Sequence, residues 1–277
     1  MQFLVPFAIL TALFLVVAAL ERVHRLQFRP SALLRPHIGT DALWYLVAGG
    51  AAALSTYVFR PVLSHLAIAP LQIGVAAMPA ALRLAIAVTI FDFVAFAVHL
   101  AIHRSDALWS VHKVHHSSLH LDWLATTRTH MFEHLVRNIP AQAVLFAFGF
   151  TSPTISGAIL VYALFAVVGH SNLDLDLSVL ELIFITPRLH RRHHVPDTTQ
   201  HNFGTILSIW DRMFKRLLIA DTQPDEHFGV PGQVHSYPQR FPDAARQPLR
   251  ENLARARSLH RSSPIDDAVS PVTVLGE

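Results

Sequence analysis

Nineteen histidines occur in the 277 residues of this chain, and eight of them form three tight clusters. The first cluster has the spacing HxxxH, and the second and third both have the spacing HxxHH. The clusters consist of His99 and His103, then His112, His115 and His116, then His190, His193 and His194. Residues three and four apart lie on one face of a helix, so each cluster can direct its imidazoles toward a common centre.

Clustered histidines of this kind indicate a metal site. Neutral imidazole is the commonest metal ligand, and it suits iron, zinc, copper and nickel. Eight imidazoles could serve two ions with roughly four ligands each. The chain has no cysteine, which excludes thiolate-bound zinc and cysteine-held iron-sulfur clusters, so any metal must be held by nitrogen and oxygen.

The composition is that of a membrane protein, with 52% hydrophobic and only 15% charged residues. Residues 3–20, 42–59 and 84–100 are apolar enough and, at about 20 residues each, long enough to cross a bilayer. Residues 139–150 and 154–168 are apolar but short, and we expect a helical hairpin that either spans the membrane or re-enters it. The sequence therefore predicts an all-α integral membrane protein with about three transmembrane helices plus a hairpin, and a helical cap that holds the histidine-rich dimetal site.

The distribution of charge predicts which side of the membrane the site faces. Arg22, Arg25, Arg29 and Arg35 follow the first apolar stretch, so the positive-inside rule places that loop in the cytoplasm. The third stretch then returns to the cytoplasmic side, where its histidines lie. We expect a multi-pass protein with a cytoplasmic active site, in the inner membrane if the chain is bacterial. Because the arginines flank apolar stretches, the net charge of +3 does not indicate nucleic-acid binding.

The histidine clusters lie within residues 92–214, and we expect one catalytic domain over residues 1–238. From residue 239 to 277 the chain is rich in proline, arginine, serine and aspartate. We expect a polar, largely mobile tail there, with one helix over residues 249–260.

Acidic residues near the clusters are candidates for orienting the imidazoles, because neutral ligands leave the charge of a metal uncompensated. Asp92 lies inside the third apolar stretch, where an acid is costly and usually functional. We expect it to orient an imidazole or to hold helices together, and Asp211 is the second preferred candidate. For the other acids we expect a solvated surface position: Glu133, Asp174, Asp176 and Asp197.

The order of the three clusters, with an apolar hairpin between the second and third, resembles the fatty acid hydroxylase and sterol desaturase superfamily. The resemblance covers roughly residues 92–214 and extends to further motifs. These are Leu108-Trp109, the HHSS at 115–118, Thr127-Arg128-x-His130-x-x-Glu133, His170-Ser171-Asn172, Thr186-Pro187, Asn202-Phe203-Gly204 and Trp210-Asp211-Arg212-x-Phe214.

This resemblance implies a membrane-bound non-haem diiron oxygenase that hydroxylates or desaturates a lipid with O2. It implies two iron ions held by the eight clustered histidines and by a ninth, His170. It makes His130 and Asn172, together with Asp92 and Asp211, candidates for hydrogen bonds to the ligands. It implies no separate catalytic side chain. Electrons would come from a separate electron-transfer protein. Six basic residues could dock that protein or bind anionic lipid: Arg188, Arg191, Arg192, Arg212, Lys215 and Arg216.

Two other classes of protein remain as alternatives. A membrane metal transporter would place polar residues deep in several spans, whereas only Asp92 lies well inside one. A zinc-dependent membrane hydrolase typically uses three protein ligands, and the chain contains no HExxH motif. Both fit the histidine pattern less well than an oxygenase.

Overall fold

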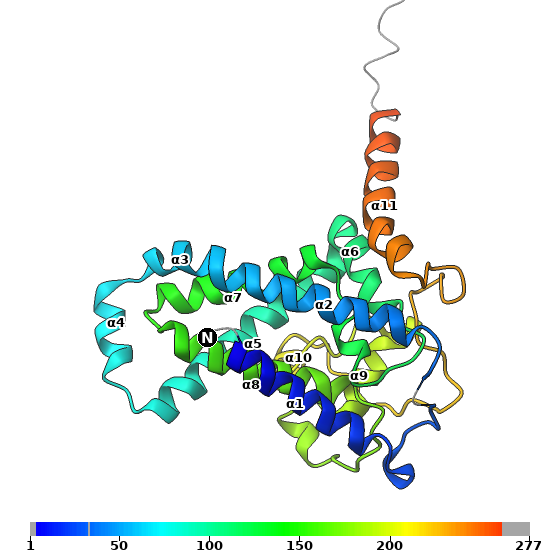
Figure 1. Cartoon of the computed structure of the whole chain (residues 1–277), viewed down its shortest axis with the longest axis horizontal. Coiled ribbons are helices and arrows are strands. Elements are labelled where there is room, and N and C mark those ends of the chain that lie inside the picture. The colour runs from blue at the N-terminus through cyan, green and yellow to red at the C-terminus, as the bar shows by residue number, and fades with distance from the viewer. Residues whose placement is uncertain (1–3, 33, 262–277) are drawn as a thin grey trace, which may run out of the picture.

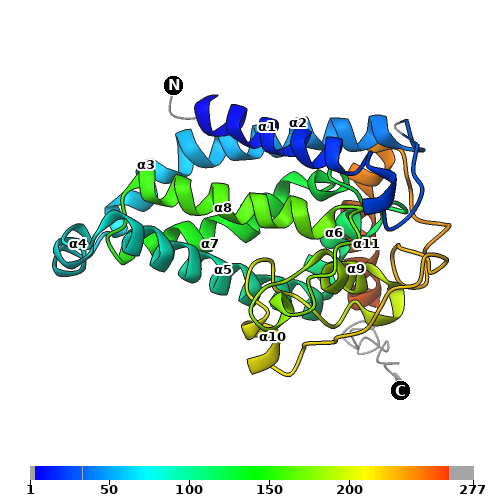
Figure 2. The same ribbon diagram turned by 90° about the horizontal axis from the view of Figure 1, so that it is seen from below.

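The computed structural model describes residues 4–32 and 34–261, and within them the only β-structure is two isolated bridges. The predicted all-α fold is confirmed. Five helices run broadly along the long axis of the molecule (Figure 1). These are α1 (Leu4–Leu20), α2 (Ile38–Leu54), α5 (Ala80–Arg104), α7 (Met131–Ala147) and α8 (Ser152–His170). Turned by 90°, the molecule shows α1 and α2 as one layer over α5, α7 and α8 (Figure 2).

Three helical segments of the described residues have the length and apolarity to cross a membrane: Ile38–Leu66, Ala80–Arg104 and Ser152–His170. The first is α2 extended by a π-helical turn (Ser55–Phe59), by α3 (Arg60–Leu63) and by a 3-10 turn (Ser64–Leu66). The 25 residues of α5 rise about 37 Å, which exceeds the roughly 30 Å hydrocarbon core. The predicted first span corresponds to the shorter α1, and its predicted first residue, Phe3, lies outside the described residues.

The predicted hairpin consists of α7 and α8, but α7 begins at Met131 rather than at residue 139. The turn between the two helices needs Gly149, whose φ is +84°, a conformation that only glycine adopts without strain. A Cβ at this position would lie 2.4 Å from the Cα of Gln72 in α4 (Ala69–Ala76). The turn therefore packs directly on α4, at the end of the molecule away from α6 and α9 (Figure 1).

The apolar core lies where α5 packs against α7 and α8. Ala87, Phe91 and Ala95 of α5 contact Leu145 of α7 and Ile155 of α8, and all five are buried. Small side chains on α5 allow the helices to approach closely, as is typical inside membranes. This packing fixes the end of α5 that carries the HxxxH pair.

Two short helices carry the remaining clusters, and each is started by a hydroxyl cap. The side chain of Ser105 accepts the N–H of Leu108 at the start of α6 (Asp106–His116). The side chain of Thr186 accepts the N–H of Leu189 at the start of α9 (Pro187–His194), where Pro187 takes the first helical position. We call residues 172–240 the cap; it contains α9 and α10 (Ile209–Met213).

The C-terminal part of the described chain is a long helix, α11 (Phe241–Arg261), rather than a helix limited to residues 249–260. It lies against α6, where Lys113 Nζ and Glu251 Oε2 are 2.9 Å apart and Asn252 Nδ2 donates to Ser110 Oγ at 2.8 Å. From there it projects sideways from the long axis (Figure 1). The rest of the predicted tail, residues 262–277, lies outside the described residues.

Candidate metal centre

The fold brings all nine candidate histidines into two adjoining groups, and all nine are buried. In each group one ring nitrogen per residue lies within 4.8 Å of the others. The five-histidine group consists of His99, His103, His112, His116 and His193. The four-histidine group consists of His115, His170, His190 and His194.

The HxxHH spacing divides each cluster between the two groups. Residues four apart stay together, as His112 and His116 do in the five-histidine group and His190 and His194 in the four-histidine group. The middle histidine of each cluster, His115 or His193, belongs to the other group. A single helical turn therefore supplies both groups, and two such helices facing each other build the pair of sites.

Distances between ring nitrogens fit shared coordination of an ion. The Nε2 atoms of His99 and His112 are 3.0 Å apart, as are those of His170 and His115 and those of His190 and His170. Two nitrogens bound at right angles to one ion, each about 2.0–2.1 Å from it, would be roughly 2.9 Å apart.

Several of the buried ring nitrogens have no partner in the described structure. Both ring nitrogens of His103 and of His116, and Nε2 of His193, have no hydrogen-bond partner in the described structure. Buried polar atoms are nearly always paired, so unpaired ones need an explanation. A bound metal ion would satisfy these atoms, and the donor set of imidazoles suits iron, zinc, copper or nickel.

Backbone carbonyls orient several of the rings. The Nδ1–H of His99 donates to the carbonyl of Phe203 at 2.8 Å, and the Nδ1–H of His193 donates to the carbonyl of His201 at 2.7 Å. In the four-histidine group, the Nδ1–H of His170 donates to the carbonyl of Ala166 at 2.8 Å. These bonds fix the tautomer and leave Nε2 free to bind a metal.

Glu133 is the one carboxylate that hydrogen-bonds a histidine of either group within the described residues, and the expectation that it is solvated was wrong. It is 2% exposed, and its Oε1 accepts the Nδ1–H of His112 at 2.7 Å. Arg137, one turn further along α7, lies 3.5 Å from the same oxygen. The signal that could have found Glu133 was already in the sequence, in the TRxHxxE motif.

Asp92 and Asp211 act on the cap and not directly on an imidazole. Asp92 accepts the N–H of Ile206, the N–H of Leu207 and the indole N–H of Trp210, at 2.9 to 3.0 Å. It therefore holds the cap against α5, the second of its two predicted roles. Asp211 accepts the N–H of Phe203 at 2.7 Å and the N–H of Gly204 at 2.8 Å, and thus positions the carbonyl that orients His99.

Asn172 and His130 are engaged elsewhere. The side chain of Asn172 bonds to the backbone N–H and carbonyl of Arg29, at 3.1 and 2.7 Å, and joins the cap to the segment after α1. His130 caps α7 by accepting the N–H of Phe132, and its ring packs beside Trp44. Neither is hydrogen-bonded to any of the nine histidines in the described structure, so the expected contact role does not fit them.

Burial favours the neutral form of three ligand candidates outside the membrane segments, His115, His116 and His193. Burial, reinforced by neighbouring histidines, holds the pKa of His115 and of His116 well below the usual range. Burial likewise lowers the pKa of His193, to about 3. Neutral imidazole is the form that binds metal, so these sites need no proton release to accept an ion.

A cavity of about 260 Å³ reaches the centre from the membrane segments. Its walls come from α1, α2, α5, α7 and α8, and one end is lined by His99, His115, His170 and His190. A concave pocket that combines apolar walls with a few polar groups is the usual form of a ligand site.

Nine buried imidazoles at one end of membrane-length helices define a membrane protein with a two-part histidine metal centre. Residues 84–216 match the model of the fatty acid hydroxylase family, which confirms the resemblance over this region. No solved structure matches the chain significantly.

Among curated proteins, the chain is 30% identical over 158 residues to the ornithine lipid hydroxylase OlsE of Rhizobium tropici, across 56% of the chain and 48% of that protein. It is 29% identical over 126 residues to the alkylglycerol monooxygenase of Caenorhabditis elegans, across 44% of the chain and 24% of that protein. The alkylglycerol monooxygenase of Danio rerio is 33% identical over 122 residues, across 42% and 26%. The matches therefore span at most about half the length of these relatives.

Proposed function

We propose that this chain is a membrane-bound non-haem diiron oxygenase that uses O2 and external electrons to hydroxylate or desaturate a C–H bond of a lipid. The observation that carries the proposal is the pair of buried imidazole groups at the end of a cavity between membrane-length helices. The names of the relatives support it, because they are a lipid hydroxylase and two alkylglycerol monooxygenases.

In this proposal the five-histidine group and the four-histidine group each bind one iron ion. Bound iron would activate O2 for the cleavage of an unactivated C–H bond, a reaction that side chains alone cannot carry out. The protein provides neutral ligands in fixed orientations, and Glu133 provides the one carboxylate in contact with a ligand among the described residues. The cavity walls hold the lipid chain against the centre and exclude water.

A hydrogen-bonded chain connects the centre to the cavity wall and keeps Glu133 in place. Arg137 bridges Glu133 and Tyr162, whose hydroxyl accepts from Arg137 Nη2 at 2.8 Å. The hydroxyls of Tyr162 and Thr205 are in turn 2.8 Å apart, which ties α8 to the cap. Arg137, Tyr162 and Thr205 all line the cavity. In the proposed enzyme these side chains position Glu133 and shape the space beside the reacting carbon.

We further propose that electrons come from a separate carrier and that the centre faces the cytoplasm, in keeping with the arginines that follow α1. The predicted docking face is smaller than expected. Arg188 pairs with Glu181 and Asp221, and Arg192 pairs with Glu226. Arg191 is buried over the ring of Phe28. The charges left for a partner or for anionic lipid are those of Arg212, Lys215 and Arg216.

Metal analysis tests the proposal. The full chain, purified in detergent under anaerobic conditions and loaded with ferrous iron, is expected to hold two irons and no haem. Lipids extracted from cells that express the chain should contain a species with one added oxygen atom or with two fewer hydrogens. One zinc per chain with unchanged lipids would contradict the oxygenase and support a hydrolase. The number of histidines argues against a hydrolase, because groups of five and four exceed the three protein ligands of a typical catalytic zinc.

A further inference from the structure

The cavity beside the histidines has one polar wall. His134, Asn138 and Gln142 line it at intervals of four residues along α7, and residues so spaced share a helix face. The walls that come from α2 and α8 include small apolar residues such as Ala52 and Ala163. Nε2 of His134 has no hydrogen-bond partner in the described structure, and a purely hydrocarbon ligand would leave it unpaired, which costs free energy. The polar stripe therefore favours an occupant that carries polar groups of its own.

The polar stripe leads to Arg60, the first residue of α3. Arg60 Nε donates to Gln142 Oε1 at 2.8 Å, and its Nη1 donates to Ser156 Oγ at 2.8 Å. Gln142 is itself fixed, because its Nε2 donates to Ser55 Oγ at 2.8 Å. All four side chains line the cavity, so the guanidinium is held in one orientation at the cavity wall.

Arg60 has no counter-charge. Its partners are neutral, and no carboxylate of the described residues forms an ion pair with it. Arg35, in contrast, is buried between Asp41 and Asp122. A guanidinium is always charged, and a charge within a membrane segment such as Ile38–Leu66 is costly and usually functional. Its two hydrogen bonds also leave N–H donors for a ligand.

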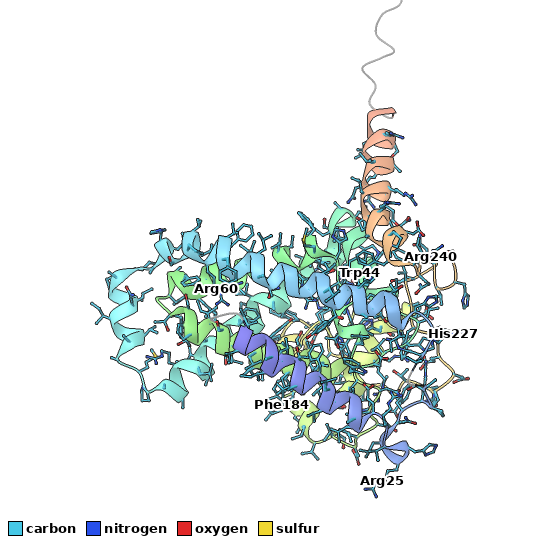
Figure 3. All side chains as sticks on the ribbon, in the orientation of Figure 1. Arg25, Trp44, Arg60, Phe184, His227 and Arg240 are labelled. Atoms are coloured by element: carbon cyan, nitrogen blue, oxygen red, sulfur yellow. The ribbon has the colours of Figure 1, made fainter. Side chains whose placement is uncertain are left out.

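Arg60 and the histidines lie at opposite ends of the cavity. Gln142 follows Glu133 by nine residues of α7, which is about 13 Å at 1.5 Å per residue. Ser156 precedes His170 by fourteen residues of α8, which is about 21 Å at the same rise. Figure 3 shows Arg60 toward the α4 end of the molecule, far from His227 on the cap.

We propose that Arg60 binds an oxygen anion, a carboxylate or a phosphate, carried by a long-chain amphipathic substrate. Arginine presents a planar set of donors that matches both anions. The chain of the substrate then runs along the apolar walls of α2 and α8 to the histidines, so the oxidised carbon is remote from the anionic group. This proposal rests on the proposed function and adds the substrate class and the region of the chain that is oxidised.

Binding of two ligands of equal chain length tests the proposal. The full chain in detergent at pH 8 is incubated with radiolabelled palmitate or hexadecanol, and the equilibrium affinities are compared. The wild type should bind the acid about tenfold more tightly, which is the effect of one hydrogen bond to a charged group. Arg60→Gln should remove this preference by weakening palmitate alone. Arg83→Gln is the matched control. Arg83 is also an arginine of a membrane-length helix and lies in the first turn of α5, but it does not line the cavity.

Further variants and competitors distinguish the possible outcomes of this binding experiment. Arg60→Lys keeps the charge and should keep part of the preference, which covers a failure of Arg60→Gln to fold. Millimolar inorganic phosphate should not displace palmitate; displacement would overturn the lipid assignment and indicate a site for free phosphate. Equal affinity of the wild type for acid and alcohol would overturn the proposal. Binding requires neither iron nor O2, so a protein that shows the preference but oxidises no lipid would contradict only the proposed function.

Discussion

The two histidine groups share α6 and α9, whereas α5 contributes only to the five-histidine group and α8 only to the four-histidine group, and the two groups are supported differently. The five-histidine group is oriented from distant segments, by Glu133 of α7 and by the cap carbonyls of His201 and Phe203. In the four-histidine group the one such bond is local, from His170 to the carbonyl of Ala166 in its own helix, and Nδ1 of His115 and of His194 have no partner in the described structure.

Access to the two groups also differs. Three members of the four-histidine group line the cavity, whereas His99 is the one member of the five-histidine group that does so. The five-histidine group is thus oriented by the cap and by α7, and the four-histidine group faces the cavity. In the proposed diiron centre, we expect the five-histidine group to retain its ion tightly and the four-histidine group to exchange its ion faster.

Loss of a ligand should have the largest effect. We expect His112→Ala or His193→Ala to abolish O2-dependent lipid oxidation. This loss of activity is larger than the roughly 10- to 100-fold loss expected on removing a hydrogen-bond partner of a ligand. Iron should fall from two ions to one, while membrane insertion is retained. His235→Ala, whose ring contacts His227 on the cap, should leave activity and iron unchanged. Full activity in either purified ligand variant would show that its histidine binds no metal.

Glu133→Gln should weaken the five-histidine group alone. The amide keeps the shape of the side chain but not its charge, and loss of such a carboxylate typically costs about 10- to 100-fold in metal affinity. Iron titration of the apoprotein should show one site weakened and the other unchanged. Asp176→Asn, at an exposed position, is the control. Equal weakening of both sites would mean that the two groups are not supported independently.

Chelation should remove the two ions in two phases. Because the four-histidine group lines the cavity, its ion should leave first, and iron release from the wild type should be biphasic with about equal amplitudes. In Glu133→Gln the rate of iron release in the slow phase should approach the rate in the fast phase. Release in a single phase from the wild type would remove the distinction between the two groups.

Asp92→Asn should have the smallest effect on the centre. An amide replaces a buried carboxylate that accepts bonds from two backbone N–H groups and the indole of Trp210. The expected loss of stability is about 1.5–3 kcal/mol, the contribution of a hydrogen bond to a charged group. Thermal unfolding in detergent should report it, with two irons still bound before unfolding. Loss of iron without a lower unfolding temperature would place Asp92 in the metal centre.

The histidine spacing predicted that the residues of each cluster lie on one face of a helix, because helical periodicity is local. It did not predict the division into five and four, since that depends on α6 and α9 facing each other after a long hairpin. The prediction that Asp92, rather than Glu133, was the preferred candidate to orient an imidazole was wrong for the same reason. Asp92 stood out because it lies in an apolar run, yet its direction is set by the cap, whereas Glu133 is buried because α7 packs against α5 and α6. The early start of α11 depends on its contacts with α6, which composition does not reveal.

The bond between His99 and the carbonyl of Phe203 spans 104 residues of sequence. During synthesis the ribosome must therefore deliver the whole hairpin and the start of the cap before the first imidazole acquires its final tautomer. Nascent chains with α5 already in the bilayer carry an unfinished centre, so in the proposed enzyme we expect iron to be loaded only after the cap has been synthesised.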